Sequence, residues 1–309
     1  MLFKAKFIII KSRIKRFCIF KNICSFFIYA SVIMACAQDN QEVTIETQQL
    51  SNTVYMLTGQ GGNIGLSVGD DGVFMIDGQY ANLTPKILEA IKKISDKPIH
   101  YLVNTHWHGD HTGGNENLSK LGVNIIAHDN VYKRLSESTN DKPASLKGAL
   151  PIITFNDKLH IHVNGEDVFV FHVDNAHTDG DALLYFTESN VLHTGDTFFN
   201  HLYPYIDLNS GGSVNGYIEA VKKALMFTDF ETKIIPGHGK LSNKKEYLFF
   251  LSMLETLKTS VLAEIAAGKT EDQVANDTNI TKTFDELGYR WAFIDSEKIR
   301  RTFYKSLKH

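Results

Sequence analysis

From Val43 onward the chain alternates between two hydrophobic periods. Short apolar stretches separated by Gly- or Asp-rich turns predict four strands within residues 43–78. Residues 83–95 then place their apolar side chains on one helical face, with a proline in the first turn, and predict a helix. A buried strand over 99–105 follows, and residues 123–138 predict one more strand and a second helix.

The second half of the chain repeats this order of strands followed by a helix. The predicted elements are a hairpin over 158–173 that turns at Asn164–Gly165, two strands within 182–196, a helix over 213–227, a strand over 233–239 and a long helix over 243–268. This doubled order predicts an α/β fold in which two similar sheets pack face to face with helices outside. The pattern shows no linker, so we interpret residues 38–309 as one domain that ends in C-terminal helices.

Residues 1–37 follow a different pattern, with seven basic side chains, no acidic one and an apolar stretch over 23–37. A basic start, a short apolar centre and small residues at the end are typical of an export signal. The alternative is an uncleaved membrane anchor, but the stretch is shorter than the about 20 residues of a membrane span. Cleavage after Ala37 and lipidation of Cys36, as in a bacterial lipoprotein, both remain open. The protein is therefore predicted to be exported, to the periplasm or the cell envelope.

Cysteine usage and charge narrow the chemistry of the predicted domain. All three cysteines lie in the first 37 residues, so a metal held by residues 38–309 must have His, Asp or Glu ligands. Removing the seven basic residues of that segment leaves 25 basic against 35 acidic residues, a net charge of −10. Such a charge repels phosphate backbones, so the sequence disfavours a nuclease and a nucleic-acid partner.

Four polar loops, each directly after an apolar strand, contain the candidate chemistry. The first loop reads His-Trp-His-Gly-Asp-His over 106–111, and the others contain His177, Asp196 and His238. A single His or Asp in such a loop is most often a hydrogen-bonded or turn-forming residue. Imidazole and carboxylate groups that recur at the ends of adjacent strands can instead converge on one point, which favours a metal site.

The motifs THWHGDHTGGN, AHTDGD, HTGDTFF and PGHG, in this order between Val43 and about Leu257, resemble those of the metallo-β-lactamase superfamily. The resemblance implies an αββα sandwich of two packed mixed β-sheets with helices on the outer faces. It also implies a site for two metal ions at one edge of the sheets. The implied ligands are His106, His108 and His177 for the first metal, Asp110, His111 and His238 for the second, and Asp196 as a carboxylate between them.

The donor set determines which metals and reactions the resemblance favours. Nitrogen and oxygen ligands suit two Zn²⁺ ions per chain, with Fe or Mn as alternatives. Many lactamases of the superfamily have a cysteine near Asp196, which this domain lacks. The diiron redox branch resembles a pattern with Glu at the second histidine; here that residue is His108 and no flavin domain follows, so we expect hydrolysis rather than redox chemistry.

The resemblance implies that a hydroxide between the two metals attacks a carbonyl carbon. Asp110 is expected to hold its metal and to orient this hydroxide, and so to be the catalytic residue. Asp77 is the first candidate to fix a ligand imidazole from behind, and His193 the second. The loop Gly59–Asn63 is a candidate flap over the site.

The expected substrate is a small molecule with a cyclic amide or ester, similar to a β-lactam or a lactone. Residues 197–205 are aromatic and contain no Lys or Arg, which predicts an apolar wall with Asn200, His201 and Tyr203 as polar contacts and disfavours a carboxylate-bearing substrate. The alternatives are a thioesterase similar to glyoxalase II, a general esterase, and a metal-binding lipoprotein without turnover. The sequence predicts no oligomeric state.

Overall fold

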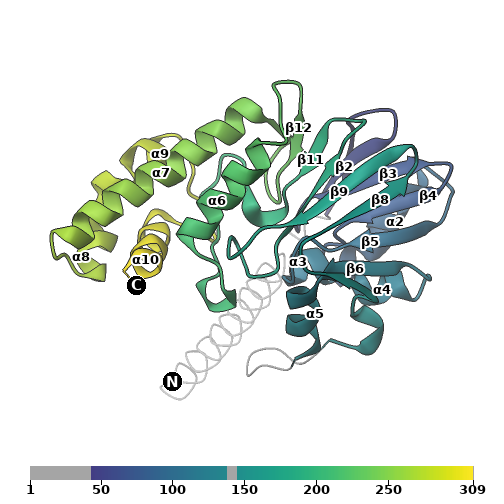
Figure 1. The fold of residues 1–309 in the computed structure, drawn as a ribbon, viewed down its shortest axis with the longest axis horizontal. Helices are drawn as coiled ribbons and strands as arrows, with labels where there is room; N and C mark the ends of the chain where they lie inside the picture. The colour runs from purple at the N-terminus through teal and green to yellow at the C-terminus, as the bar shows by residue number, and fades with distance from the viewer. Residues whose placement is uncertain (1–42, 138–144, 309) are drawn as a thin grey trace, which may run out of the picture. The chain divides into compact units, whose positions relative to one another are not determined.

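The computed structural model describes residues 43–137 and 145–308. The predicted export signal and Cys36 lie outside the described residues. The part of the chain from Thr44 onward forms one compact unit. It consists of two β-sheets packed face to face with helices on their outer faces (Figure 1). The predicted α/β sandwich is therefore confirmed.

The first sheet combines an antiparallel half with a parallel half. Its strands, in spatial order, are β1 (Glu46–Gln49), β2 (Val54–Thr58), β3 (Ile64–Gly69), β4 (Gly72–Ile76), β5 (Ile99–Val103), β6 (Asn124–His128) and β7 (Ile153–Phe155). Strands β1 to β4 pair antiparallel, and β4 to β7 pair parallel. The carboxyl ends of β4 and β5 consequently meet at one edge of the sheet.

The second sheet is mostly antiparallel. Its strands lie side by side in the order of the sequence: β8 (Lys158–Val163), β9 (Glu166–His172), β10 (Ala182–Phe186), β11 (Val191–His193), β12 (Lys233–Ile235) and β13 (Ser242–Asn243). Only β11 and β12 pair parallel among these strands. The predicted hairpin between β8 and β9 turns at Asn164 and Gly165, whose φ angles of 54° and 76° are those of a type I′ turn.

Apolar side chains from both sheets fill the space between them. Phe74 of β4 and Phe186 of β10 are fully buried and meet edge to face at 6.2 Å. Val168 and Val170 of β9 point to the same cluster, because alternate residues of a strand share one face. This core holds the two sheets together behind the loops of the candidate site.

Helices cover both outer faces. The first half contains α2 (Thr84–Lys92), α3 (Gly109–Thr112), α4 (Asn115–Ser119) and α5 (Asp129–Ser136), and the second half α6 (Val214–Leu225), α7 (Lys244–Ala266), α8 (Glu271–Asn276), α9 (Lys282–Glu286) and α10 (Ser296–Leu307). Short 3-10 turns are η1 (Ala81–Leu83), η2 (Lys147–Ala149), η3 (Gly195–Thr197), η4 (Leu208–Ser210) and η5 (Thr278–Ile280). Within the described ranges, none of the helices combines the length and apolar character that a membrane crossing requires.

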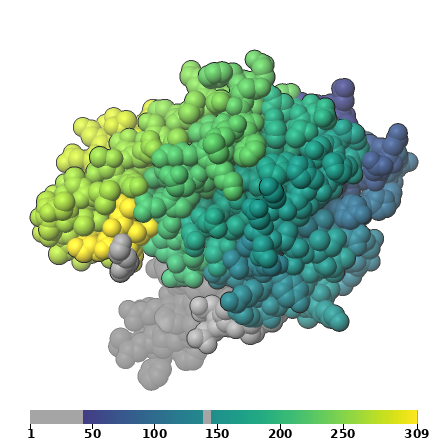
Figure 2. Space-filling model, viewed as in Figure 1, coloured from purple at the N-terminus to yellow at the C-terminus, as the bar shows by residue number. Residues whose placement is uncertain are grey.

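Local capping explains where the two longest predicted helices begin. Ser213 accepts a hydrogen bond from the Gly216 amide at the start of α6, and Asn243 accepts one from the Glu246 amide at the start of α7. Buried side chains of α8, α9 and α10 join those of α6 and α7 in one apolar cluster, and the yellow and green surfaces of these segments adjoin in Figure 2. The chain between α9 and α10 then reaches the candidate site.

Candidate metal centre

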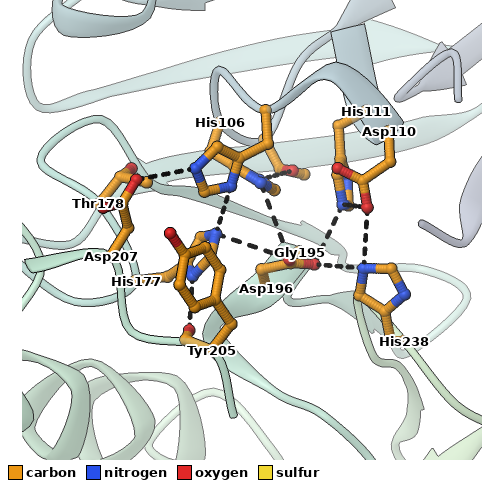
Figure 3. Close-up of polar contacts among 12 residues, drawn as sticks. His106, Asp110, His111, His177, Thr178, Gly195, Asp196, Tyr205, Asp207 and His238 are labelled. Carbon is orange, nitrogen blue, oxygen red and sulfur yellow. Dashed lines mark hydrogen bonds and ion pairs between the residues drawn. The ribbon is translucent and has the colours of Figure 1, made fainter. Parts of the chain in front are cut away.

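All seven predicted ligand residues lie together at one edge of the sandwich (Figure 3). They come from loops that follow β5 in the first sheet and β9, β11 and β12 in the second sheet. Two groups result, each with ligand atoms within 4.8 Å of one another: His106, His108, His177 and Asp196 in one, and Asp110, His111 and His238 in the other. The convergence predicted from the strand ends therefore occurs in the structure.

The loop after β5 supplies four of these residues by making one short helical turn. His108 has an extended backbone, with φ −65° and ψ 151°, and α3 begins directly after it. The amides of His111 and Thr112 donate to the carbonyl of His108 and close the turn. As a result His106 and His111 are buried while Asp110 remains partly accessible.

Asp77 holds two residues of the loop after β5 in place. It follows β4, is fully buried and has a φ of 62°. Its carboxylate accepts the Thr105 amide at 2.8 Å and the Thr105 hydroxyl at 2.7 Å, and it pairs with His111 Nδ1 at 2.7 Å. The predicted contact between Asp77 and a ligand imidazole is confirmed. His193, the second candidate, instead contacts the backbone of Asn63 and Gly195.

A second buried carboxylate, Asp207, was missed by the sequence analysis. Its Oδ2 lies 3.0 Å from His108 Nε2, while its Oδ1 accepts the amides of Asn209 and Ser210 at the start of η4. Burial opposes the charge of Asp207, but the hydrogen bonds from His108 and Ser210 lower its pKa to about 2. Only the cap pattern at residues 207–210 marks Asp207 in the sequence, and it does not indicate a contact with His108.

The backbone of the loop that contains Asp207 holds His177. Its Nδ1 donates to the carbonyl of Tyr205 at 2.7 Å, so its Nε2 faces the centre, 2.9 Å from His108 Nδ1. His108 in turn presents Nδ1 to the centre because Asp207 holds Nε2. Each of these two imidazoles thus has one nitrogen free to bind a metal ion, while a hydrogen bond at the other nitrogen fixes the orientation of the ring.

Asp196 lies between the two groups. Its Oδ2 is 3.5 Å from His177 Nε2 and 3.8 Å from His106 Nε2. Its Oδ1 is 3.1 Å from His111 Nε2 and 3.4 Å from His238 Nε2. Figure 3 shows this carboxylate with one group of imidazoles on either side. One side chain therefore presents an oxygen to each group.

Two glycines allow this close approach. A Cβ atom at Gly237 would lie 2.1 Å from Asp196 Oδ1, and a Cβ at Gly62 would lie 2.1 Å from His111 Cε1. Gly62 belongs to the loop Gly59–Asn63 that the sequence analysis named as a candidate flap, and the exposed Gln60 of this loop lines the cavity described below. Asn63 is buried, and its side chain donates to the carbonyls of Pro236 and Gly239 at 2.8 and 2.9 Å, which anchors one end of the loop.

The unsatisfied donor and acceptor atoms of the centre fit a bound cation. His106 Nε2, His111 Nε2 and Asp196 Oδ1 are buried, and none makes a hydrogen bond of acceptable geometry to a described residue. Buried polar atoms rarely remain without a partner, and a metal ion would provide one for all three. The donors are imidazole nitrogens and carboxylate oxygens only, a set that suits Zn²⁺.

The electrostatics of the centre also favour a positive charge. Burial holds the pKa of His106 well below its usual range and lowers that of His177 to about 4, so both are neutral and have a lone pair for a metal. Burial opposes the ionised form of Asp196, but His111, His238 and His106 outweigh it and hold the pKa of Asp196 well below its usual range. Burial also disfavours the charged form of His238, but the carboxylates of Asp196 and Asp110 outweigh it and raise the pKa of His238 to about 9.

A cavity of about 630 Å³ opens onto the centre. Asp110, Asp196, His108 and His238 reach it from the centre, and the aromatic residues that line it are Tyr80, Trp107, Phe199, Tyr205, Trp291 and Phe293. No Lys or Arg is among the described residues that line the cavity. The apolar wall expected from residues 197–205 is therefore present in part and extended by Trp291 and Phe293, which the sequence analysis did not include.

The three polar contacts expected in that segment are absent from the lining. Asn200 donates to the carbonyl of Lys240, and His201 has a side chain that is 62% exposed and lies near Glu246. Tyr203 is fully buried, and its hydroxyl donates to Asp285. The expectation was wrong because Asn200 and Tyr203 turn toward the C-terminal helices and His201 toward the surface, which leaves the cavity wall to other residues of the segment.

With this geometry established, comparison with known proteins identifies the family. The family model described as the metallo-beta-lactamase superfamily matches residues 57–239, which include all seven candidate ligands. The chain belongs to this superfamily. The resemblance inferred from the sequence motifs is thus confirmed.

Relatives within the superfamily are distant. A hydroxyacylglutathione hydrolase from Pelagibacter ubique is 30% identical over 51% of this chain and 57% of its own length. A 2,4-dinitroanisole O-demethylase subunit alpha from Nocardioides sp. is 22% identical over 60% of the chain and 54% of its own length. A type 2 metallo-beta-lactamase from Bacillus sp. is 22% identical over 70% of the chain and 84% of its own length. The chain thus spans just over half the length of the first two relatives.

Solved structures show the same fold at low identity. A metallo-beta-lactamase from Pontibacter korlensis superposes with a TM-score of 0.60 at 19% identity, over 69% of this chain and 99% of that protein. A stereoselective inverting sec-alkylsulfatase from Pseudomonas sp. gives a TM-score of 0.64 at 18% identity, over 84% of this chain and 50% of that protein. The chain is therefore similar to proteins that are named for several different substrates.

Proposed function

We propose that the protein is a dinuclear zinc hydrolase that cleaves the acyl C–O or C–N bond of a small cyclic ester or amide, lactone-like or β-lactam-like. The observation that carries the proposal is Asp196, whose two oxygens face separate groups of imidazoles, each with one buried Nε2 atom, of His106 or His111, that makes no well-formed hydrogen bond. A lone hydrogen-bonded carboxylate has no need of this arrangement. Membership of a superfamily whose relatives include hydroxyacylglutathione hydrolase and metallo-beta-lactamase supports metal-dependent hydrolysis.

The residues that would hold the two ions follow from the two groups. His106 Nε2, His108 Nδ1 and His177 Nε2 would hold the first, and Asp110 Oδ2, His111 Nε2 and His238 Nε2 the second, with Asp196 between them. When bound, the ions supply Lewis acidity toward a carbonyl and lower the pKa of water. Zn²⁺ is the expected metal, with Fe or Mn as alternatives.

The chain's own side chains orient and shield the reaction. Asp77, Asp207 and the Tyr205 carbonyl fix one nitrogen each on His111, His108 and His177. Asp110 Oδ2 lies 3.2 Å from His238 Nε2, and the Asp110 side chain is 22% exposed at the cavity, so it can orient an attacking water toward a bound carbonyl. With a substrate bound, the aromatic lining would shield that carbonyl from bulk water.

A thioesterase is the second candidate, because the hydroxyacylglutathione hydrolase from Pelagibacter ubique is 30% identical over half of this chain. Substrate profiling separates the two. The full chain, loaded with Zn²⁺, should hydrolyse a neutral chromogenic lactone faster than a thioester or a carboxylate-bearing lactam. Preference for the thioester would establish the second candidate, and rapid turnover of penicillins with neutral esters untouched would overturn the substrate class.

The catalytic assignment is tested by Asp110→Asn with Phe230→Ala as the control. The Asp110 variant should lower kcat by about 10²-fold with a smaller change in KM, because the carboxylate positions the reacting water. Phe230→Ala should be unaffected, since Phe230 is exposed and lies outside the cavity. Full activity after metal removal, confirmed by elemental analysis, would overturn the proposal, and metal binding without turnover of any of the three substrates would favour a metal-binding protein.

Export is proposed on the order of basic, apolar and small residues in 1–37 alone. The mature chain is expected to begin at Gln38 or at a lipid-modified Cys36. Intact-mass analysis of protein from the envelope and soluble fractions distinguishes these two. A cytosolic protein that retains residues 1–37 would contradict the proposal.

A further inference from the structure

The cavity wall beside the candidate metal centre is built by a segment distant in sequence. Residues 287–295, between α9 and α10, bring Trp291 and Phe293 to the cavity. The ring centroid of Trp291 lies 5.9 Å from that of Phe199 and 6.3 Å from that of His238. The ring of Phe293 meets Tyr205 edge to face at 5.1 Å. The wall is therefore continuous with a candidate metal ligand.

This segment is fixed to the loop that carries Tyr205 and Asp207. Trp291 Nε1 donates to the carbonyl of Tyr203 at 2.9 Å, and the Tyr203 amide donates to the carbonyl of Tyr289 at 2.8 Å. The buried Tyr203 hydroxyl donates to Asp285 at 2.8 Å. The position of Trp291 relative to the centre is thus set by three hydrogen bonds, as a preorganised binding surface requires.

Exposure distinguishes these aromatics from the core. Phe198 and Tyr203 are fully buried, whereas Phe293 is 49% and Tyr80 39% exposed. Exposed aromatic rings that line a concave site retain apolar surface that a ligand can bury. Lys298 packs its Nζ 3.9 Å from the centroid of Phe293 and donates to the Phe293 carbonyl at 2.9 Å, so this cation is engaged at the wall itself.

The charges of the lining point to a neutral ligand group. Apart from the candidate ligands, Asp207 is the ionisable acid among the described lining residues, and it is paired with His108. An anionic group placed against this wall would meet apolar rings, and the nearby cation Lys298 is already bound to the Phe293 ring and carbonyl.

We propose that Trp291 and Phe293 form a specificity wall that binds an apolar, preferably aromatic, neutral group of the substrate beside the candidate metal centre. The inference rests on the proposed hydrolase function, because it assigns the group that this function would accept. The ring would stack on Trp291 and contact Phe293, which places the carbonyl toward Asp110 and Asp196. The wall would act on substrate binding more than on the chemical step.

Kinetics with two neutral acetates, one of an aromatic and one of a small aliphatic alcohol, test the wall. Trp291→Ala and Phe293→Ala should each lower kcat/KM for benzyl acetate by about tenfold, mainly through KM, and that for ethyl acetate by less than about twofold. Trp291→Phe keeps an aromatic ring without the indole N–H, so it should retain most of the preference for benzyl acetate over ethyl acetate. Phe230→Ala is the control, since Phe230 is 76% exposed and lies outside the cavity. Equal losses for both esters would overturn the wall.

A binding measurement keeps the inference separate from catalysis. The chain has two tryptophans, Trp107 and Trp291, and both line the cavity, so a 5-fluorotryptophan-labelled chain reports binding through two ¹⁹F signals. Acetanilide should shift the Trp291 signal, which Trp291→Phe assigns, while N-methylacetamide and 4-acetamidobenzoate should bind more weakly. Tighter binding of 4-acetamidobenzoate would overturn the neutral preference. Binding of acetanilide without turnover of the two acetates or of the neutral chromogenic lactone would leave the wall standing and refute the proposed hydrolase.

Discussion

The carboxylate of Asp207 shows how single side chains determine the chemistry of this site. Without it, His108 could rotate and present either ring nitrogen, because the backbone of the loop constrains only its Cα. Asp207 takes Nε2 at 3.0 Å and leaves Nδ1 facing His177. Asp77 acts in the same way on His111 from the opposite sheet. The geometry of the candidate ligands is thus set by buried carboxylates behind them.

Replacing Asp207 by Asn should separate this orienting role from folding. An Asn side chain can still accept the amides of Asn209 and Ser210, but it loses the charge that holds His108. Zn²⁺ affinity should fall by about 10- to 100-fold, which competition with a chromogenic chelator measures. Asp174→Asn serves as the control because the side chain of Asp174 is 89% exposed. Unchanged affinity in the Asp207 variant would show that His108 needs no such support.

Gly237→Ala should displace Asp196, since its Cβ would lie 2.1 Å from Asp196 Oδ1 and 2.6 Å from the Gly195 backbone. The expected result is loss of about one of two bound metal ions, measured by elemental analysis of dialysed protein. Gly148→Ala is the matched control, because its nearest neighbour, Ser119 Oγ, would be 3.4 Å away. Two retained ions in the Gly237 variant would argue against Asp196 as a shared ligand.

At the scale of the elements, α7 connects the candidate site to the C-terminal layer. Asn243 caps its first turn, and Glu246 in that turn accepts from Ser242 at 2.7 Å and from Asn200 at 3.3 Å. Asn200 follows Phe199, which forms a parallel bridge with His238. The start of this helix therefore holds the loops on which Phe199 and His238 lie.

The stability that Glu246 contributes should depend on pH. Partial burial opposes its charge, but hydrogen bonds from Ser242, His201 and Asn200 lower the pKa of Glu246 below its usual 4.5. A lowered folded-state pKa contributes stability above the unfolded value, and this contribution disappears as the pH falls through the folded value. Urea unfolding of Glu246→Gln should therefore show a lower midpoint than wild type at pH 7, and the difference should shrink below about pH 4.5.

The side chain of Glu246 is 35% exposed, so solvent screening keeps this effect small. Glu255→Gln, on the exposed side of α7, provides the control. A difference between wild type and Glu246→Gln that stays constant from pH 7 to pH 4 would mean that shape or packing, and not charge, is what the substitution changes.

At the scale of the whole molecule, the candidate ligands belong to both sheets. His106, His108, Asp110 and His111 follow a strand of the first sheet, whereas His177, Asp196 and His238 follow strands of the second. A cation bound by residues from both sheets links the two halves of the sandwich and binds only the folded chain. Metal binding should consequently stabilise the whole unit and not only its loops.

Removal of zinc should therefore lower the melting temperature of the whole unit. Free Zn²⁺ at about 1,000 times its Kd adds about 4 kcal/mol per site to the free energy of unfolding. Differential scanning calorimetry with and without a chelator measures the change, and Ca²⁺ should not replace Zn²⁺ because it prefers oxygen ligands. His238→Ala should lose mainly one of the two ions. An unchanged melting temperature after proven metal removal would contradict a site shared by the two sheets.

Much of the architecture was predictable because it depends on local patterns. Alternating and helical periods located β1 to β6, β8 to β12 and the helices α2, α5, α6 and α7. The strands β7 and β13 were missed because three and two residues are too short to show a period. The polar residues after each strand end were likewise visible, since a ligand motif such as that of 106–111 is local.

The sequence by itself determined the order of strands and helices, the absence of thiol ligands from residues 38–309, and which histidines and aspartates could meet. Only the tertiary structure decided that Asp207 orients His108, 99 residues away, and that Asp196 faces both groups of imidazoles. It also decided that Trp291 and Phe293 line the cavity with Trp107. These contacts depend on how distant elements pack, because the energy that places each side chain comes from neighbours that no local pattern specifies.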